Sequence, residues 1–181
     1  RGGKIQFVGS NRAVRGYIGA RTKVVNLKGR LLMPSFIDSH AHASTAVSNV
    51  YEVALWGLGS LEAYQDAIRA FAEDNPDLTA VRGAGWDPVL IGGIGPRKED
   101  LDSIDSTRPM AFTDQDIHAL WVNSKALEAA GITGDTPNPD GGVIERVPGT
   151  VGTPGNQYGE PSGTLRESAV DLVNDILPPY T

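Results

Sequence analysis

Two of the chain's three histidines, His40 and His42, are separated by one residue and directly follow an apolar run. In a β-strand, residues i and i+2 point to the same side, so both imidazoles would project from one face together with Asp38. Neutral imidazole is a good ligand for zinc and similar ions. The spacing therefore indicates a pair of metal ligands, although surface hairpins also carry such pairs by chance.

A buried strand is expected to position this pair. Residues 30–33 and 36–37 are mostly apolar, and Pro34 lies at the entry, where a missing N–H does least harm. The histidines would then emerge at the carboxyl end of the strand, which is where barrels of parallel strands place their active sites. We expect Asp38 to hydrogen-bond a ligand as a second-shell residue ahead of coordinating the ion itself.

The composition limits the partners and the compartment. The chain has 181 residues, a net charge of −6 and no cysteine. Its Lys and Arg residues form no run, which argues against a nucleic-acid or anionic-membrane surface. No apolar stretch approaches the roughly 20 residues that span a bilayer. We expect a cytoplasmic protein whose metal, if present, is held by His or carboxylate. The composition is compatible with an oligomer.

The pattern along the chain predicts an α/β fold with a parallel sheet and crossover helices, because helical and strand periods alternate from residue 60 onward. Asn123 or Ser124 is expected to cap one helix, and Ser60 another. The predicted strands are 4–8, 22–27, 78–82, 109–113, 142–146 and 162–167. The predicted helices are 61–74, 125–130 and 169–177, with a solvated helix start at 97–102 and a loop from 148 to 161.

Several segments resemble a known family. The run Pro-Ser-Phe-Ile-Asp-Ser-His-Ala-His at residues 34–42 resembles the first-strand signature of the amidohydrolase superfamily, in which glycine stands at the place of Ser35. Residues 116–132, 140–146 and 163–167, in that order, are similar to its YtcJ-like branch. That branch has Asp-Gly-His where this chain has Asp-Ile-His at residues 116–118.

The resemblance implies a fold and a division of the chain. Residues 33–181 would form the first, incomplete part of a (β/α)₈ TIM barrel of the metal-dependent hydrolases. Residues 1–32 would form part of a small composite β-sandwich domain before it. Because a complete barrel takes about 250 residues, and the chain begins with Arg1 in place of Met, we expect an N-terminal portion of a larger enzyme.

The resemblance also implies a ligand set. His40 and His42 match the first-strand ligands of the family, and Glu167 matches the carboxylate that replaces a bridging carboxylated lysine. A glutamate suits that position because it is anionic at neutral pH and offers two oxygens. The alternative is that Glu167 only stabilises the N-terminus of the helix that follows it.

Three further residues are candidates for substrate contact: His118, Asp116 and Trp86. His118 would lie at the mouth of the barrel beside Asp116, touching substrate or tuning a ligand, or else it simply fixes a loop. Trp86 would contact substrate or belong to the core. Arg166 would bind a substrate carboxylate or carry an ordinary surface charge.

We therefore expect a metal-dependent amidohydrolase that hydrolyses a C–N bond of a small amide, carbamate or cyclic amide with metal-activated water. The cofactor would be one or two divalent ions, with zinc as the default, although iron, manganese and nickel fit as well. The catalytic aspartate base is expected beyond the chain, so the segment alone should be inactive. The alternatives are a non-catalytic barrel fragment or degenerate homologue, and an unrelated α/β binding module.

Overall fold

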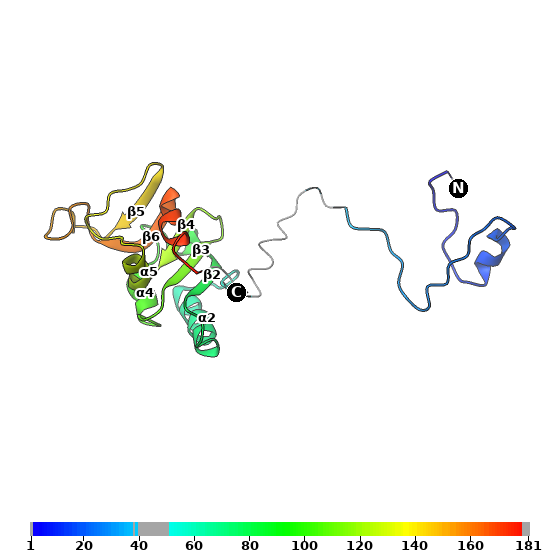
Figure 1. Cartoon of the computed structure of the whole chain (residues 1–181), viewed down its shortest axis with the longest axis horizontal. Helices are drawn as coiled ribbons and strands as arrows, with labels where there is room; N and C mark the ends of the chain where they lie inside the picture. The colour runs from blue at the N-terminus through cyan, green and yellow to red at the C-terminus, as the bar shows by residue number, and fades with distance from the viewer. Residues whose placement is uncertain (1, 38, 40–50, 179–181) are drawn as a thin grey trace. The chain divides into compact units, whose positions relative to one another are not determined.

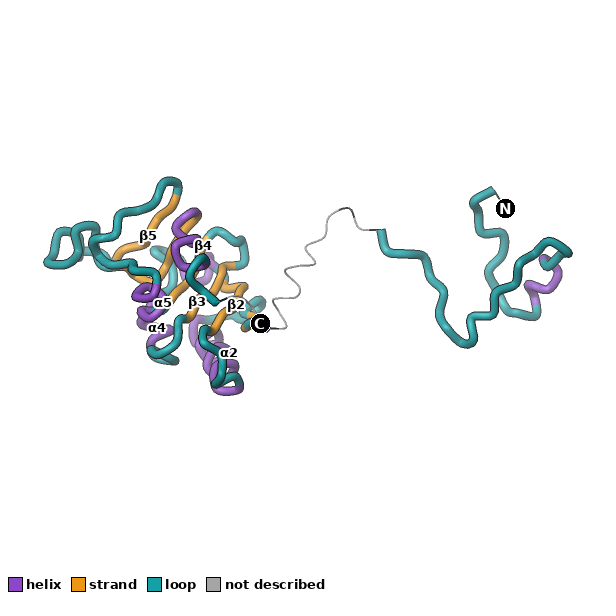
Figure 2. The backbone as a smooth tube through the Cα atoms, viewed as in Figure 1, coloured by secondary structure: helices purple, strands orange, loops and turns teal. Residues whose placement is uncertain are grey.

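The computed structural model describes residues 2–37, 39 and 51–178 and divides the chain into two compact units, Arg1–Ala41 and His42–Thr181. The second unit contains a mixed α/β fold (Figures 1 and 2). His40, His42 and Asp38 lie outside the described residues. The division falls later than the predicted boundary after residue 32, and the predicted β-sandwich and barrel domains stay predictions.

Six strands of the second unit form one sheet in the order β1-β2-β3-β4-β6-β5. The first three are parallel, as the alternating pattern predicts, whereas β4, β6 and β5 are paired antiparallel. The predicted parallel sheet is thus confirmed for one half only. The strands are β1 Val53–Ala54, β2 Val81–Trp86, β3 Met110–Asp114, β4 Ala119–Val122, β5 Gly142–Arg146 and β6 Pro161–Glu167.

The helices follow the predicted caps. Ser60 Oγ accepts the Ala63 N–H at 3.1 Å at the start of α2, and Asn123 Oδ1 accepts the Ala126 N–H at 2.9 Å at the start of α5. None of the helices in the described ranges is long and apolar enough to cross a membrane. The helices are η1 Ala13–Tyr17, α2 Leu61–Asp74, α3 Pro88–Ile91, α4 Lys98–Asp102, α5 Ser124–Ala129, η2 Ser168–Val170 and α6 Asp171–Asn174.

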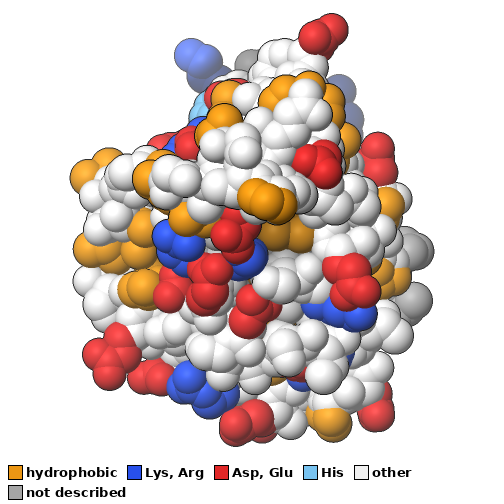
Figure 3. Space-filling model, turned by 90° about the vertical axis from the view of Figure 1, so that its left-hand side faces the viewer, with side chains coloured by type: hydrophobic (Ala, Val, Ile, Leu, Met, Phe, Trp, Pro, Cys, Tyr) orange, Lys and Arg blue, Asp and Glu red, His pale blue; other side chains and the backbone are white. Residues whose placement is uncertain are grey.

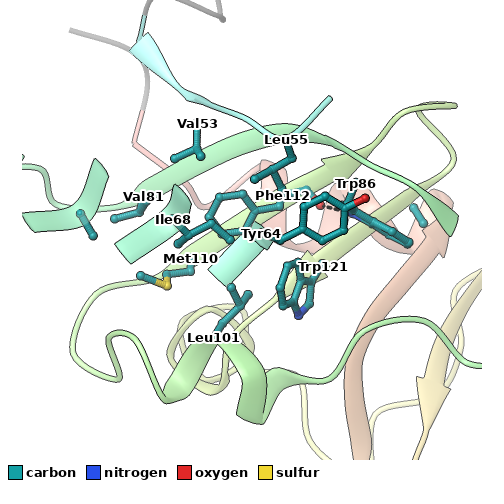
Figure 4. Packing of buried hydrophobic residues seen from close by; sticks show 12 residues of the cluster. Val53, Leu55, Tyr64, Ile68, Val81, Trp86, Leu101, Met110, Phe112 and Trp121 are labelled. Atoms are coloured by element: carbon teal, nitrogen blue, oxygen red, sulfur yellow. Dashed lines mark hydrogen bonds between the residues drawn. The ribbon is translucent and has the colours of Figure 1, made fainter. Parts of the chain in front are cut away.

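The sheet is covered on both faces. Alternate residues of a strand point to opposite faces, and in β4 Trp121 joins one apolar cluster while Leu120 joins the other. The first cluster includes Tyr64 and Ile68 of α2 (Figure 4), and the second includes residues of α5 and α6. Burial on both faces explains why β4 was missed, because Ala-Leu-Trp-Val shows no alternation of polar and apolar residues.

The predicted helix 169–177 is shorter than expected. The structure forms the turn η2 and the single-turn helix α6, while Val173 and Leu177 are buried as the periodicity predicts. The predicted loop is confirmed except at Pro161, which begins β6, since residues 147–160 connect the antiparallel strands β5 and β6. On the face shown in Figure 3, Lys and Arg side chains lie among Asp and Glu side chains.

The strands predicted in the N-terminal unit do not form in the described structure. Over the described residues 2–37 the only regular element is η1, and the ranges 4–8, 22–27 and 30–37 form no ladder. Most of their apolar side chains are exposed, and Ile37 is 97% accessible. An apolar run becomes a strand only where another strand supplies its hydrogen bonds, and the described part of this unit supplies none.

The connection between α4 and β3 is fixed by an ion pair that also caps α2. Arg108 donates to Asp105 Oδ2 at 2.6 Å and to the carbonyls of Ala72 and Asn75 at 3.1 and 2.9 Å. Burial raises the pKa of Asp105, but hydrogen bonds from Thr107 and Arg108 outweigh it and hold the pKa at about 2. Asp105 is therefore ionised at neutral pH, and its carboxylate holds the Arg108 side chain that bonds the end of α2.

We predict that Asp105→Asn lowers the free energy of unfolding by about 1–2 kcal/mol at neutral pH. Because the folded-state pKa is depressed, this stabilisation is present above about pH 4 and is lost as the pH falls toward 2. Urea unfolding at a series of pH values measures it. Asp66→Asn, which breaks the exposed pair with Arg69, is the control and should change little. A constant difference between Asp105→Asn and wild type from pH 7 to 2 would contradict the prediction.

Candidate functional site

The turn between β3 and β4 presents His118. Asp114 ends β3, and its side chain is only 3% exposed. Its Oδ1 atom accepts the N–H groups of His118 at 2.8 Å and Ala119 at 2.9 Å. The turn is held at its start by the Gln115 N–H, which donates to the Trp86 carbonyl at 2.9 Å. The chain therefore leaves β3 and returns as β4 in a tightly bonded turn with the imidazole outside.

Glu167 reaches the same place from the end of β6. The antiparallel register pairs Ala119 with Arg166, and the next N–H, that of Glu167, donates to the His118 carbonyl at 2.9 Å. The side chains then meet, with Glu167 Oε2 3.2 Å from His118 Nδ1. The imidazole is 68% exposed and the carboxylate 57%, so both remain open to an incoming ion or ligand.

Electrostatics favour the protonated imidazole. The hydrogen bond that His118 donates to Glu167 and the charge of this carboxylate raise the pKa of His118 above its ordinary value of 6.5. The nearby carboxylates of Asp114 and Asp116 act in the same direction. Protonated His118 donates to Glu167, and neutral His118 would offer a lone pair to a cation. This pair can therefore hold a proton or help to orient a ligand.

The backbone on both sides of the pair is strained. Among the described residues, positive φ at non-glycine positions occurs at Lys28, at Ile117 with 65° and at Glu167 with 51°. Such conformations cost about 1–3 kcal/mol each and cluster at functional sites. Two of the three flank or form the His118–Glu167 contact. The strain marks this contact as a candidate site on geometric grounds.

Ile117 occupies the position where the resembling family has glycine. A β-branched residue at φ 65° is disfavoured, whereas glycine adopts that conformation freely. Because the Ile117 side chain is 71% exposed, removing it sacrifices little packing. The structure thus explains why glycine suits this turn.

We predict that Ile117→Gly raises the free energy of unfolding by about 1 kcal/mol and so stabilises the protein, because relief of the strain exceeds the entropy cost of glycine. Chemical unfolding of the two proteins measures the difference. Ile117→Ala is the control, since it removes the same exposed side chain but keeps a Cβ, and it should give no gain. Equal effects of Gly and Ala would show that the turn is not strained.

Glu167 does not act as a helix cap. It lies at the N-cap position of η2, as the alternative interpretation expected, but its side chain makes no capping hydrogen bond. The carboxylate contacts His118 instead. Because η2 contains three residues, its dipole is also short. The geometry therefore favours a role for the Glu167 carboxylate other than helix capping.

The other predicted site residues do not gather at the His118–Glu167 contact, apart from Asp116. Asp116 is exposed in the turn beside His118. Trp86 is fully buried and donates its indole N–H to the Phe112 carbonyl at 2.9 Å (Figure 4), which agrees with the alternative that it belongs to the core. Arg166 pairs with Glu145 at 2.6 Å. Asp114, which the sequence analysis missed, could have been found as a polar residue directly ending an apolar strand.

The predicted metal ligands are not brought together within the described ranges. His40 and His42 lie outside them, and the described residues hold no group of three or more His, Cys, Asp or Glu side chains that could bind an ion. Glu167 nevertheless fits a ligand chemically, because its carboxylate is exposed, anionic and held by a single imidazole in the described part of the chain.

Comparison with known proteins identifies the class. A family model described as "Amidohydrolase family" matches residues 23–175, which is most of the chain. The chain therefore belongs to the amidohydrolase family. This match spans β1 to β6 and includes both the His118 turn and Glu167.

Curated relatives narrow the likeness and confirm the resemblance to the YtcJ-like branch. The amidohydrolase homologue YtcJ of Bacillus subtilis (strain 168) is 32% identical over 99% of this chain and 32% of its own length. The N-substituted formamide deformylase of Arthrobacter pascens is 31% identical over 96% of this chain and 31% of its own length. The exoenzymes regulatory protein AepA of Pectobacterium carotovorum subsp. carotovorum is 31% identical over 96% of this chain and 37% of its own length. The chain thus spans about a third of these relatives.

A solved structure shares the fold. The crystal structure of an uncharacterised metal-dependent hydrolase from Pyrococcus furiosus matches 80% of this chain and 25% of that chain, with a TM-score of 0.50 and 26% identity. The mixed α/β fold with a six-stranded sheet is consistent with part of an amidohydrolase fold.

Proposed function

We propose that the protein to which this chain belongs is a metal-dependent hydrolase that cleaves a C–N bond of a small amide, carbamate or cyclic amide. The observation that carries the proposal is the contact of Glu167 with His118 on strained backbone at the end of a strand, in a chain of the amidohydrolase family. The deformylase relative supports a C–N bond, and the Pyrococcus structure supports metal dependence.

In this proposal His40, His42 and Glu167 hold a divalent ion, with zinc as the default. A bound ion of this kind lowers the pKa of water toward about 7 and polarises a carbonyl group. His118 keeps the Glu167 carboxylate oriented through the 3.2 Å contact. Exposed His118 and Asp116 lie where they could bind polar groups of a substrate.

The experiment is elemental analysis of the purified full-length protein combined with a hydrolysis screen over N-acyl, carbamate and cyclic amide compounds. We expect about one or two divalent ions per chain, turnover of at least one compound class, and loss of turnover after chelation that Zn²⁺ restores. Turnover that survives complete removal of metal would refute metal dependence. Metal without turnover of any class would refute the C–N specificity.

A second candidate function is ligand or partner binding without turnover. It is favoured by one observation, the similarity to a relative whose name describes a regulatory protein. The same screen separates the two, because a non-catalytic homologue gives thermal shifts with compounds that it binds and no product with any of them.

A further inference from the structure

We infer that Asp114 is a positioning residue that holds the turn bearing His118 in the conformation that places this histidine against Glu167. The inference rests on the proposed function only where it assumes that the His118–Glu167 pair serves metal binding and hydrolysis. The positioning itself is a statement about hydrogen bonds within the chain.

The first argument is the environment of the Asp114 side chain. A carboxylate that is 3% exposed is costly to bury unless it is hydrogen-bonded. None of the ion pairs within the described ranges includes it. Its Oδ1 atom instead accepts two backbone N–H groups, those of His118 and Ala119. The buried carboxylate is therefore directed at the turn.

The second argument is that the bonds form a continuous connection to Glu167. Asp114 fixes the N–H of His118, and the carbonyl of His118 accepts the N–H of Glu167 at 2.9 Å. Glu167 itself is held at φ 51° and ψ −130°. A displacement of the turn would therefore move the backbone acceptor that helps to hold Glu167 in its strained conformation.

The third argument is the strain at Ile117, which lies between the Asp114 carboxylate and its first donor in sequence. A branched residue at positive φ persists only where neighbouring bonds over-determine it. The two bonds to Asp114 Oδ1 form directly after Ile117. They offset the preference of this residue for an ordinary backbone conformation.

The test compares Asp114→Ala with Asp114→Asn in the full-length protein. Asparagine keeps an Oδ1 acceptor for both N–H groups, whereas alanine removes it. The readout is hydrogen–deuterium exchange at the Glu167 amide, which does not contact Asp114. We expect roughly tenfold or faster exchange in Asp114→Ala, the factor for loss of about one net hydrogen bond, and less than about threefold change in Asp114→Asn. Unchanged exchange in Asp114→Ala, or equal acceleration in both variants, would overturn the inference.

Two further variants exclude general destabilisation. Asn123→Ala removes an equally buried hydrogen-bonding side chain from the other end of β4 and should leave Glu167 exchange relative to the rest of the sheet unchanged. Ile117→Gly removes the strain, so adding Asp114→Ala to it should accelerate exchange less than in the wild-type background. That pair also serves if Asp114→Ala alone fails to fold. A full effect in the Ile117→Gly background would contradict the link to strain.

Turnover separates this inference from the proposed function. If the protein hydrolyses a screened compound, Asp114→Ala should lower kcat about tenfold or more with KM little changed, and Asp114→Asn should retain most of the activity. Faster exchange at Glu167 in a protein without hydrolysis would support the positioning role and refute the proposed function. Hydrolysis by the wild type, with amide exchange and kcat unaltered in Asp114→Ala, would support the proposed function and refute the positioning role.

Discussion

Replacing Glu167 by Gln is expected to lower the Zn²⁺ affinity of the protein by at least about 100-fold. Changes in residues that merely orient metal ligands cost about 10–100-fold, so loss of an anionic ligand should cost more. Gln has the same size and keeps an oxygen that His118 can reach, so the fold should be retained. Competition with a chromophoric chelator measures the affinity, and circular dichroism reports the fold.

The matched control for this variant is Glu128→Gln. Glu128 is also exposed and also pairs with one cation, Lys125, at 2.8 Å, but it lies on α5, which follows the end of β4 opposite to the His118 turn. It removes the same charge from the chain, so any general electrostatic effect on Zn²⁺ appears there. Equal Zn²⁺ affinity in wild type and a folded Glu167→Gln protein would eliminate Glu167 as a ligand.

The largest effect on stability is expected at Asn123, whose buried amide group makes four hydrogen bonds. Oδ1 accepts from Met110 at 3.0 Å and from Ala126 at 2.9 Å, while Nδ2 donates to the carbonyls of Asp105 and Arg108 at 3.0 and 2.9 Å. The side chain thus joins β3, the loop before it and the start of α5. It has no exposure to water that could replace these bonds.

We predict that Asn123→Ala lowers the free energy of unfolding by about 3–5 kcal/mol, because it leaves buried backbone groups unpaired and removes a helix cap. Urea unfolding followed by circular dichroism measures this. Ser60→Ala is the comparison variant, since it removes only one exposed cap bond from α2, and it should cost about 1 kcal/mol. A loss at Asn123 no larger than at Ser60 would show that the network adds nothing beyond the cap.

Local signals predicted α2, α4, α5 and most strands of the second unit. Ser60 and Asn123 are residues that cap helices by themselves, and Met110–Asp114 is an apolar run of strand length, so neighbours along the chain were enough. The N-terminal ranges 4–8 and 22–27 look equally suited to strands but form none in the described structure. A strand depends on hydrogen-bonding partners from any part of a chain, and the local sequence pattern does not report them.

By itself, the sequence determined the family of this chain, because the order of motifs along a chain can be recognised without its three-dimensional structure. It also proposed His40, His42 and Glu167 as ligands on that basis. Only the tertiary structure decided that β4 and β6 run antiparallel, that Trp86 is buried, and that Glu167 meets His118. The physical reason is that the two residues of this contact are far apart in sequence, and the pairing of β4 with β6 brings them together.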